Sequence, residues 1–297
     1  MQVLTFEKLL KQKEPFAAAI GFFDGVHIGH QKVIDNAVNH ANDNDLKSLV
    51  ITFDRSPKVA ITEYLTPMES KLQHFTMLGV DYVLVLEFNE LLRELSADDF
   101  VENYLIQLGV VYVSVGFDFR FGHRGTGDTS HLQKWREFEV DVCNPVLLRE
   151  TKVSSTSVKK SLQMGDLEAV KTMLGRNFSI NGVVGHGRQL GRTIGFPTAN
   201  LMLDEQFLGL SGVFTTRVMV EGKEYFGMTN IGYNPTANLQ ESVSVETHIF
   251  EFNEDIYGCA LDLEFLYKIR DEIKFEGIEQ LIAQLEADKI VAISLRK

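Results

Sequence analysis

Residues 17–36, AAAIGFFDGVHIGHQKVIDN, decide how the first half of the chain folds. Ala17 to Phe22 is a short apolar run of the kind found in buried strands, and Asp24-Gly25 supplies turn residues. Apolar residues then recur at helical spacing to the end of the stretch. The pattern predicts a strand, a tight turn and a helix, with His27 and His30 at the entrance of that helix.

The entrance of such a helix is a natural seat for phosphate, because unpaired backbone N–H groups and the helix dipole favour negative charge there. Two imidazoles at this place can donate hydrogen bonds to the same oxyanion. Histidines at this spacing are also common as packing, capping or metal-ligand residues. Asp24, Gly25 and Gly29 favour the phosphate interpretation, since glycines let backbone approach a ligand and open α/β sheets bind ligands after a strand.

Residues 21–31, GFFDGVHIGHQ, resemble the nucleotidyltransferase signature of prokaryotic bifunctional riboflavin kinase/FAD synthetases. The resemblance implies catalytic roles for His27 and His30. It also implies nucleotide binding by five residues of the signature: Gly21, Phe23, Asp24, Gly25 and Gly29. The tetrapeptide from His27 to His30 resembles the first signature of class I aminoacyl-tRNA synthetases too, which leaves an AMP-transfer enzyme of that class as an alternative.

Length and composition predict a two-domain globular protein. The 297 residues are 44% hydrophobic and 24% charged, which suffices for two separate cores. The net charge is -12 and no block of Lys and Arg stands out, so a nucleic-acid partner is not expected. Cys143 and Cys259 lack metal-ligand spacing and are expected to be buried apolar residues. The sequence predicts no oligomeric state.

The N-terminal 15 residues lack the apolar core and cleavage site of a signal peptide, and no apolar run reaches membrane-spanning length. We therefore expect a cytoplasmic protein without a membrane partner.

Strand-like and helix-like segments alternate from Phe16 to about Leu148. The expected strands are 46–53, 81–86 and 110–116, and the expected helices run from Thr66 to Leu78 and from Ser96 to Leu108. The first of these helices opens on a capping box, Thr66-Pro67-Met68-Glu69, with Pro at the first helical position. The alternation predicts an α/β fold with a Rossmann-like nucleotidyltransferase domain, built on a mainly parallel, doubly wound sheet.

Residues 115–132, VGFDFRFGHRGTGDTSHL, carry too many glycines and polar residues for a core segment, which predicts a binding loop. A glycine-rich surface loop without a ligand is the alternative. The segment resembles the Gly-x-Asp-Phe-x-Phe-Gly motif of the riboflavin kinase/FAD synthetases. This resemblance implies flavin contacts by Asp118, Phe119, Phe121 and Gly122.

Residues 153–162, VSSTSVKKSL, can cap a helix and offer hydroxyl groups to a phosphate, although capping alone would account for them. They stand where the synthetases carry a second nucleotide-binding signature, Ile-Ser-Ser-Thr-Arg-Ile-Arg. The resemblance therefore implies nucleotide binding by Ser154, Ser155 and Thr156.

The sequence departs from the family pattern at three places. Ser157 and Lys159 replace the two arginines of the second signature, and Arg55-Ser56-Pro57 stands where the family has Pro-His-Pro. Arginine grips phosphate through two parallel hydrogen bonds, which serine cannot do and lysine matches only as a point charge. We therefore predict a robust kinase and a weakened adenylyltransferase, unless Arg55 reaches the phosphates from its own loop.

The alternation of strand and helix stops near Phe178. Short strand-like runs follow one another from Ile180 onward, with a hairpin turn at Glu221-Gly222-Lys223. Such a series predicts a C-terminal antiparallel β-barrel, with a helix at 278–287 packed against it. The expected domains are residues 1–178, carrying adenylyl transfer, and residues 179–297, carrying riboflavin phosphorylation.

Residues 182–201, GVVGHGRQLGRTIGFPTANL, form the strongest motif of the second half. Its glycines could leave N–H groups free for phosphate, although it lacks the ending of a P-loop. Thr198 and Asn200 share one strand face and offer hard oxygen ligands suited to Mg²⁺, but a turn with a capping Asn explains them equally well. The string resembles the riboflavin kinase domain, which implies Mg²⁺ binding with ATP by Thr198 and Asn200. It also implies nucleotide binding by Gly185, His186, Gly187, Arg188 and Gly191.

Residues 230–236, 245–249 and 269–275 resemble further signatures of that domain, and the last of them places Arg270 and Phe275 at the flavin. Glu246 lies on a partly apolar strand face, where it suits a general base, although a salt-bridged glutamate is as good an interpretation. In the kinase it would take the proton from the 5′-hydroxyl of riboflavin.

The sequence thus predicts an enzyme that makes FMN from riboflavin and FAD from FMN, with ATP and Mg²⁺. A flavin- or nucleotide-binding regulator without activity is the alternative of another class.

Overall fold

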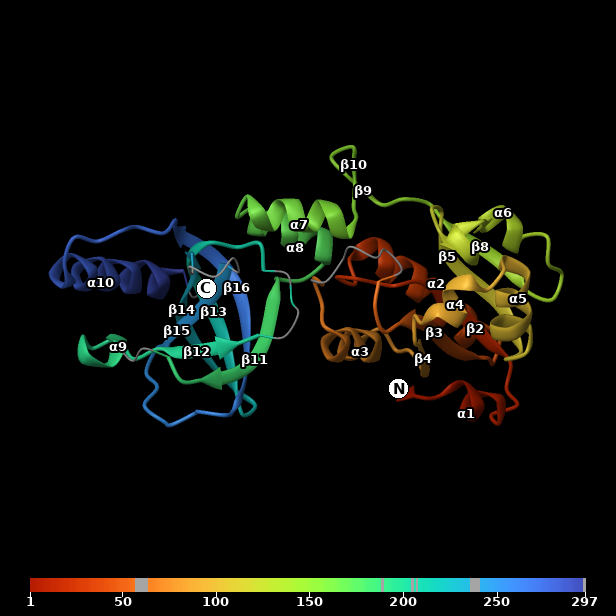
Figure 1. Ribbon diagram of the computed structural model, residues 1–297, viewed down its shortest axis with the longest axis horizontal. Coiled ribbons are helices and arrows are strands. Elements are labelled where there is room, and N and C mark those ends of the chain that lie inside the picture. The colour runs from red at the N-terminus through yellow and green to blue at the C-terminus, as the bar shows by residue number, and fades with distance from the viewer. Residues whose placement is uncertain (57–63, 188–189, 204–205, 207, 236–240, 296–297) are drawn as a thin grey trace. The chain divides into compact units, whose positions relative to one another are not determined.

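The computed structural model describes all residues except 57–63, 188–189, 204–205, 207, 236–240 and 296–297. Contacts between Cα atoms divide the chain into two compact units, Met1–Ser155 and Thr156–Lys297. The first unit holds a parallel sheet flanked by helices, and the second holds a closed barrel accompanied by helices (Figure 1). The mixed α/β fold with an antiparallel barrel, predicted from the sequence, is confirmed.

The first unit contains both strands and helices. They are β1 (Gln2–Val3), α1 (Phe6–Leu10), β2 (Phe16–Ile20), α2 (Ile28–Asp43), β3 (Lys47–Phe53), α3 (Met68–Met77), β4 (Tyr82–Leu86), α4 (Glu90–Glu94), α5 (Ala97–Val101), the π-helical η1 (Glu102–Ile106), β5 (Val110–Gly116), β6 (Arg120–Phe121), the 3₁₀ turn η2 (His123–Gly125), β7 (Gly127–Asp128), α6 (Thr129–Leu132), β8 (Glu139–Cys143), β9 (Leu147–Leu148) and β10 (Thr151–Lys152).

The main sheet of this unit has six strands in the order β1-β4-β3-β2-β5-β8, and every neighbouring pair is parallel. Each residue of β2 is buried, as its apolar run predicts for a central strand. Because β3 lies on one side of β2 and β5 on the other, the strand order reverses at β2. Open α/β sheets bind ligands at such a switch point, outside the carboxyl ends of the strands.

One predicted helix start is wrong. The helix α3 begins at Met68, and no side chain caps it, so the capping box predicted at residues 66–69 does not form. The backbone N–H of Thr66 donates instead to the carboxylate of Asp24, 3.3 Å away, which ties the helix entrance to the loop after β2. Ser96 does cap α5 as predicted, through a bond from the N–H of Asp99 to its hydroxyl oxygen.

The second unit is built around a barrel. Its elements are α7 (Ser155–Gln163, beginning at the last residue of the first unit), α8 (Leu167–Leu174), β11 (Ser179–Gly185), α9 (Leu190–Thr193), β12 (Ala199–Met202), β13 (Gly212–Val220), β14 (Lys223–Pro235), β15 (Glu241–Ile249), β16 (Ala260–Arg270) and α10 (Ile278–Ser294). The barrel closes in the order β11-β12-β15-β14-β13-β16, with antiparallel neighbours throughout.

Inside the barrel, three threonine hydroxyls form a chain. Thr229 on β14 lies 2.8 Å from the hydroxyl of Thr216 on β13 and 2.9 Å from that of Thr247 on β15. All three side chains are buried, so each hydroxyl depends on its protein partners. The hydroxyl of Thr215, also buried, has no hydrogen-bond partner among the described residues.

This contrast predicts opposite results for two isosteric substitutions. Thr229→Val removes both bonds and strands two buried hydroxyls, so we expect it to lower the free energy of unfolding of the second unit by about 1 to 3 kcal/mol. Thr215→Val removes only an unpaired polar group and should leave stability unchanged or raise it. Differential scanning calorimetry measures both, while fluorescence of the single tryptophan, Trp135, reports on the first unit as a control. Equal effects of the two variants would contradict the hydroxyl chain.

Candidate active sites

The loop after β2 has the form that the sequence predicts. β2 ends at Ile20 and α2 begins at Ile28, with His27 at the N-cap. The Nδ1 atom of His27 accepts a hydrogen bond from the backbone N–H of His30, 3.2 Å away. Because Nδ1 is the acceptor, the neutral His27 ring carries its proton on Nε2, where it can donate to a ligand.

The backbone of this loop is strained. Phe23, Gly25 and Val26 have φ values of 55°, 84° and 41°, and such angles are rare for a bulky residue and especially for a β-branched one. Each strained non-glycine residue costs about 1 to 3 kcal/mol, and strain of this kind gathers at functional sites. Glycine is favoured at position 29 for a different reason, because a Cβ there would lie 3.2 Å from the ring of His27.

The two imidazoles lie face to face. Their ring centroids are 3.6 Å apart and their planes differ by 18°. Burial holds the pKa of His30 well below its usual value, and the nearby positive charges of Lys71 and Lys152 lower it further, so this ring is neutral at pH 7. Its Nδ1 atom is buried and has no hydrogen-bond partner among the described residues. A bound ligand would supply the hydrogen-bond partner that this buried atom lacks.

Other predicted residues of this loop are anchors. Asp24 is 7% exposed, and its backbone carbonyl accepts a hydrogen bond from the hydroxyl of Ser155 at 2.8 Å. The ring of Phe23 is buried and packs edge-on against Phe75 of α3. A Cβ at Gly21 would come within 2.9 Å of the Phe23 ring. Their roles in nucleotide binding stay predictions. Those of Ser154, partly buried, and of Thr156, exposed, do too.

Sequence reasoning missed Lys71. Its side chain is 2% exposed, and its amine donates to the carbonyl oxygen of Phe22 at 2.8 Å. Burial lowers the pKa of Lys71 to about 8, and attraction to Asp24 opposes that shift. The signal lay in the helix period, because Lys71 and Phe75 are four residues apart and therefore share the buried face of α3.

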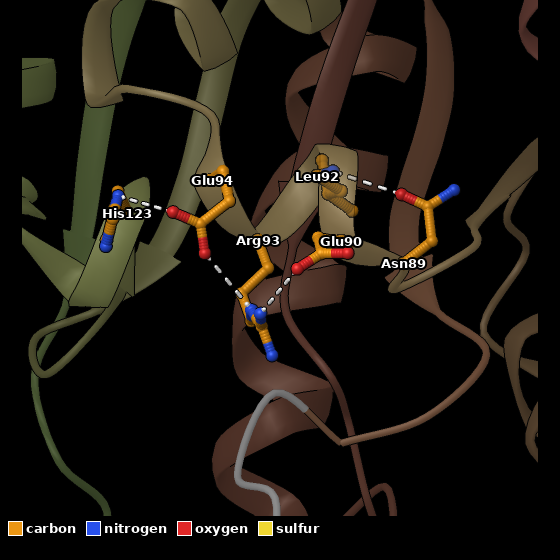
Figure 2. A network of polar contacts seen from close by, with 6 residues as sticks. All are labelled: Asn89, Glu90, Leu92, Arg93, Glu94 and His123. Carbon is orange, nitrogen blue, oxygen red and sulfur yellow. Dashed lines mark hydrogen bonds and ion pairs between the residues drawn. The ribbon is translucent and has the colours of Figure 1, made fainter.

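The glycine-rich loop after β5 packs onto the turn between α4 and α5. His123 lies 3.1 Å from the carboxylate of Glu94, and its N–H donates to the carbonyl of Leu95 at 2.6 Å. Figure 2 shows Glu94 shared between His123 and Arg93. Gly122 has a φ of 71°, and a Cβ there would lie 2.7 Å from the backbone nitrogen of Ala97. Packing therefore accounts for this glycine.

Two aromatic residues of the same segment, Phe119 and Phe121, pack in the core, whereas Phe117 is exposed. Phe121 is 7% exposed, stacks on Phe119 and packs against Phe100. Asp118 is exposed and pairs with Lys152, 2.5 Å away. The flavin contacts of Asp118, Phe119, Phe121 and Gly122 stay predictions.

In the second unit, a cavity of about 220 Å³ lies between the outer face of the barrel and α10. It is lined by Gly191, Ile194, Phe196, Thr198, Val213, Met228, Asn230, Glu246, His248, Arg270, Glu272, Ile273, Phe275, Leu281 and Leu285. Five of the predicted site residues therefore meet here, although they come from widely separated parts of the sequence. They are Gly191, Thr198, Glu246, Arg270 and Phe275.

Glu246 is the central carboxylate of this cavity. In the barrel register it pairs with Asn200 on one side and with Asn230 on the other, so the three residues form a row across β12, β15 and β14. The hydroxyl of Thr198 lies 3.5 Å from one carboxylate oxygen, and the hydroxyl of Ser244 donates to the other at 3.0 Å. The sequence did not predict this contact of Ser244.

The predicted phosphate-binding glycines are placed close to this row. A Cβ at Gly187 would collide with the amide of Asn200, and one at Gly191 would collide with the carbonyl of Phe196. Gly185 is the strand partner of Asn200, and a Cβ there would collide with the side chain of Met202. His186 is exposed and packs against Tyr257, with ring centroids 4.1 Å apart and the ring planes tilted by 31°. Arg188 lies outside the described residues.

Arg270 is held by α10. Its guanidinium makes hydrogen bonds of 2.7 to 3.0 Å to both carboxylate oxygens of Asp288, a residue that is 2% exposed. Gln284 donates to the same carboxylate at 2.8 Å. The guanidinium carbon also lies 5.9 Å from the centre of the Phe275 ring. The pair of Arg270 and Asp288 thus fixes the helix that walls the cavity, and Asp288 was not predicted from the sequence.

The described part of the chain contains no group of three or more His, Cys, Asp or Glu side chains that could hold a metal ion. Cys143 is buried as expected, whereas Cys259 is partly exposed because it follows the turn before β16. No helix among the described residues combines the length and the apolar character needed to cross a membrane.

Comparison with known proteins agrees across both units. A family model described as FAD synthetase matches residues 9–157, and one described as riboflavin kinase matches residues 174–295. Proteins described as bifunctional riboflavin kinase/FMN adenylyltransferase are similar over nearly the whole chain. That of Listeria monocytogenes is 40% identical over 280 residues, which cover 91% of this chain and 89% of the relative. That of Bacillus subtilis is 36% identical over 301 residues, covering 96% and 94%.

A solved structure is similar as well. A crystal structure described as a macrolide-efflux protein from Streptococcus pneumoniae matches with a TM-score of 0.89 and 30% sequence identity, covering 98% of this chain and 99% of that one.

A nucleotidyltransferase-like sheet joined to a kinase-like barrel defines a two-domain transferase that acts on nucleotides. The chain belongs to the family of bifunctional riboflavin kinase/FMN adenylyltransferases. The alternatives of a class I aminoacyl-tRNA synthetase and of a regulator without activity are not favoured by any of these relatives.

The pair of Arg270 and Asp288 predicts a binding defect. Asp288→Asn keeps the shape but removes the charge that holds Arg270, so we expect riboflavin to bind about tenfold more weakly, as loss of one charge-assisted hydrogen bond would imply. Asp271→Asn is the matched control, because it makes the same charge change at the neighbouring, exposed residue. Quenching of riboflavin fluorescence measures both. If both variants weaken riboflavin binding equally, or if neither weakens it, the role given to Asp288 is contradicted.

Proposed function

We propose that the two reactions of the family are carried out by separate units of this chain. The second unit phosphorylates riboflavin to FMN, and the first transfers AMP from ATP to FMN to make FAD. The observation that carries the proposal is the row of Asn200, Glu246 and Asn230, of which Glu246 and Asn230 line the cavity under α10, together with the stacked His27 and His30 at the helix entrance of the other unit. The expected cytoplasmic location and the absence of a nucleic-acid partner stay predictions.

In the kinase reaction, Glu246 acts as the general base. Its carboxylate lines the cavity and is oriented by the hydroxyls of Thr198 and Ser244. It accepts the proton of the riboflavin 5′-hydroxyl as that oxygen attacks the γ-phosphate of ATP, and ADP leaves. Arg270 and Phe275 line the same cavity and are proposed to position the flavin.

The residues beside Glu246 fit Mg²⁺ bound with ATP. Thr198 offers a hydroxyl oxygen and Asn200 an amide oxygen, which are hard ligands, and the missing Cβ of Gly187 leaves room for the Asn200 amide to lie against that backbone. When bound, Mg²⁺ would neutralise charge on the phosphates. The phosphates themselves are proposed to lie along the glycines Gly185, Gly187 and Gly191, with His186 and Arg188 beside them.

In the adenylyl transfer no proton need be removed, because FMN already presents a phosphate nucleophile to the α-phosphate of ATP. Catalysis then consists of positioning and charge stabilisation. His27 donates from Nε2, and the neutral His30 adds a second hydrogen bond as pyrophosphate leaves. The N-terminus of α2 contributes its dipole.

Two substitutions should separate the activities. Glu246→Gln removes the base, so we expect FMN formation to fall by at least a hundredfold while adenylylation of supplied FMN stays within twofold. His30→Ala should do the reverse. The test incubates each variant with riboflavin or FMN, ATP and Mg²⁺, and resolves the products by chromatography. Loss of both activities in either folded variant would contradict the two-site proposal.

We further propose that adenylyl transfer is the weaker activity. Ser157 and Lys159 stand in place of two arginines, and Arg55, which could compensate, is 63% exposed in its side chain and pairs with the neighbouring Asp54. Loss of one charge-assisted contact costs about 1.5 to 3 kcal/mol, which is roughly ten- to a hundredfold in rate.

The double variant Ser157→Arg, Lys159→Arg should therefore raise kcat/KM for FMN adenylylation about tenfold or more, with riboflavin phosphorylation as the control within the same chain. If the natural protein already makes FAD as fast as FMN, or if the arginines change nothing, the weakness of this site is disproved.

A further inference from the structure

A buried ammonium group supports the strained loop of the first unit. The carbonyl oxygen of Phe22 directly precedes the residues with positive φ, and it accepts two hydrogen bonds. One comes from the amine of Lys71 at 2.8 Å, and the other from the hydroxyl of Thr52 at 3.2 Å. The amine also lies 4.1 Å from the centre of the Phe22 ring, which adds a cation–π attraction.

The segment that leads into α3 holds the loop at a second point. The carboxylate of Asp24 accepts a hydrogen bond from the N–H of Thr66, two residues before α3 begins. Lys71 lies one turn into α3. The loop is therefore held at Phe22 by α3 and at Asp24 by the segment before it, on either side of the strained Phe23.

Packing alone does not require a charge at this position. An unbranched apolar residue such as methionine would fill a similar space without the desolvation that an ammonium group suffers when buried. A lysine placed here therefore contributes something that methionine cannot. Two contributions need the charge of lysine: the hydrogen bond to the loop and the electrostatic field at the two histidines.

We propose that Lys71 is a positioning residue for adenylyl transfer: its ammonium group holds the Phe22 carbonyl, and through it the strained loop, in the shape that presents His27 and the α2 N-terminus to the nucleotide phosphates. This inference rests on the proposed function of the first unit. Lys71 acts through the loop, because its own amine is buried against Phe22.

The groups that face this ammonium are few among the described residues. Asp24 of the loop attracts it, and His30 of α2 lies close enough for the charge of Lys71 to lower the pKa of that histidine. With its pKa lowered to about 8, Lys71 is charged at pH 7 and loses its charge as the pH rises through 8. The charged form is the one that holds the carbonyl most strongly, so adenylyl transfer should decline above pH 8.

The experiment compares Lys71→Met with Lys134→Met, which removes an exposed lysine of the same unit, and measures both reactions in the full chain. We expect Lys71→Met to lower kcat for FMN adenylylation ten- to a hundredfold and to abolish its decline above pH 8. Riboflavin phosphorylation should stay within twofold, and Lys134→Met should change neither. Lys71→Arg, which remains charged above pH 8, should recover part of the rate and keep it at high pH.

A second variant covers a failure to fold. Thr52→Val removes the other donor to Phe22 without changing side-chain shape, and it should lower adenylyl transfer about two- to tenfold; Trp135 fluorescence confirms that the first unit is folded. Unchanged adenylyl transfer in folded Lys71→Met, or in Thr52→Val if the first variant unfolds, overturns the proposal. So does a decline above pH 8 that persists in Lys71→Met. If the natural protein makes FMN but no FAD, the proposed function of the first unit fails and this inference falls with it.

Discussion

The first unit depends on a backbone constraint. Within four residues of the loop after β2, the chain takes positive φ at Phe23, Gly25 and Val26, and two of these residues are not glycine. Such a loop persists only where its surroundings hold it. Several contacts hold it. Lys71 donates to the carbonyl of Phe22, just before the strained residues. Asp24 accepts hydrogen bonds from Thr66 and from Ser155, and the ring of Phe23 is buried. This arrangement places a helix N-terminus and two stacked imidazoles at the switch point of a parallel sheet.

The second unit places its groups by a different constraint. Strand register in a closed barrel fixes which residues lie side by side, so Asn200, Glu246 and Asn230 line up across three strands. The inward-facing side of the same strands is occupied by buried residues, including the threonine chain, and the outward-facing side becomes the floor of a cavity. The roof is α10, held by the ion pair of Arg270 and Asp288. Rigid strands suit a reaction that requires a base at a defined distance from a hydroxyl group.

The sequence predicted those elements that depend on interactions between residues close together in the chain. The strand at 110–116 and the helix entrance at His27 follow from apolar runs, turn residues and helical spacing, and the structure has them at the predicted places. Long-range partners were harder. Lys71 looks like an ordinary polar residue of an amphipathic helix until its burial is known, and Asp288 gains meaning only when β16 meets α10. Phe121 sits in a motif that suggests ligand contact, yet its ring belongs to the core, because glycine-rich motifs serve loop packing as well as binding.

The central claim is that the strained loop and the two stacked histidines form the phosphate seat of the first unit. Nuclear magnetic resonance of the full chain, labelled at its histidine rings and titrated with pyrophosphate, tests it most directly. His30→Gln and His27→Gln variants assign the two signals. The account predicts that the signals of His27 and His30 shift together and saturate, with the pKa of His30 rising when the anion binds, while the signal of His248 in the barrel moves much less. Saturable binding of pyrophosphate that leaves His27 and His30 unmoved would contradict it.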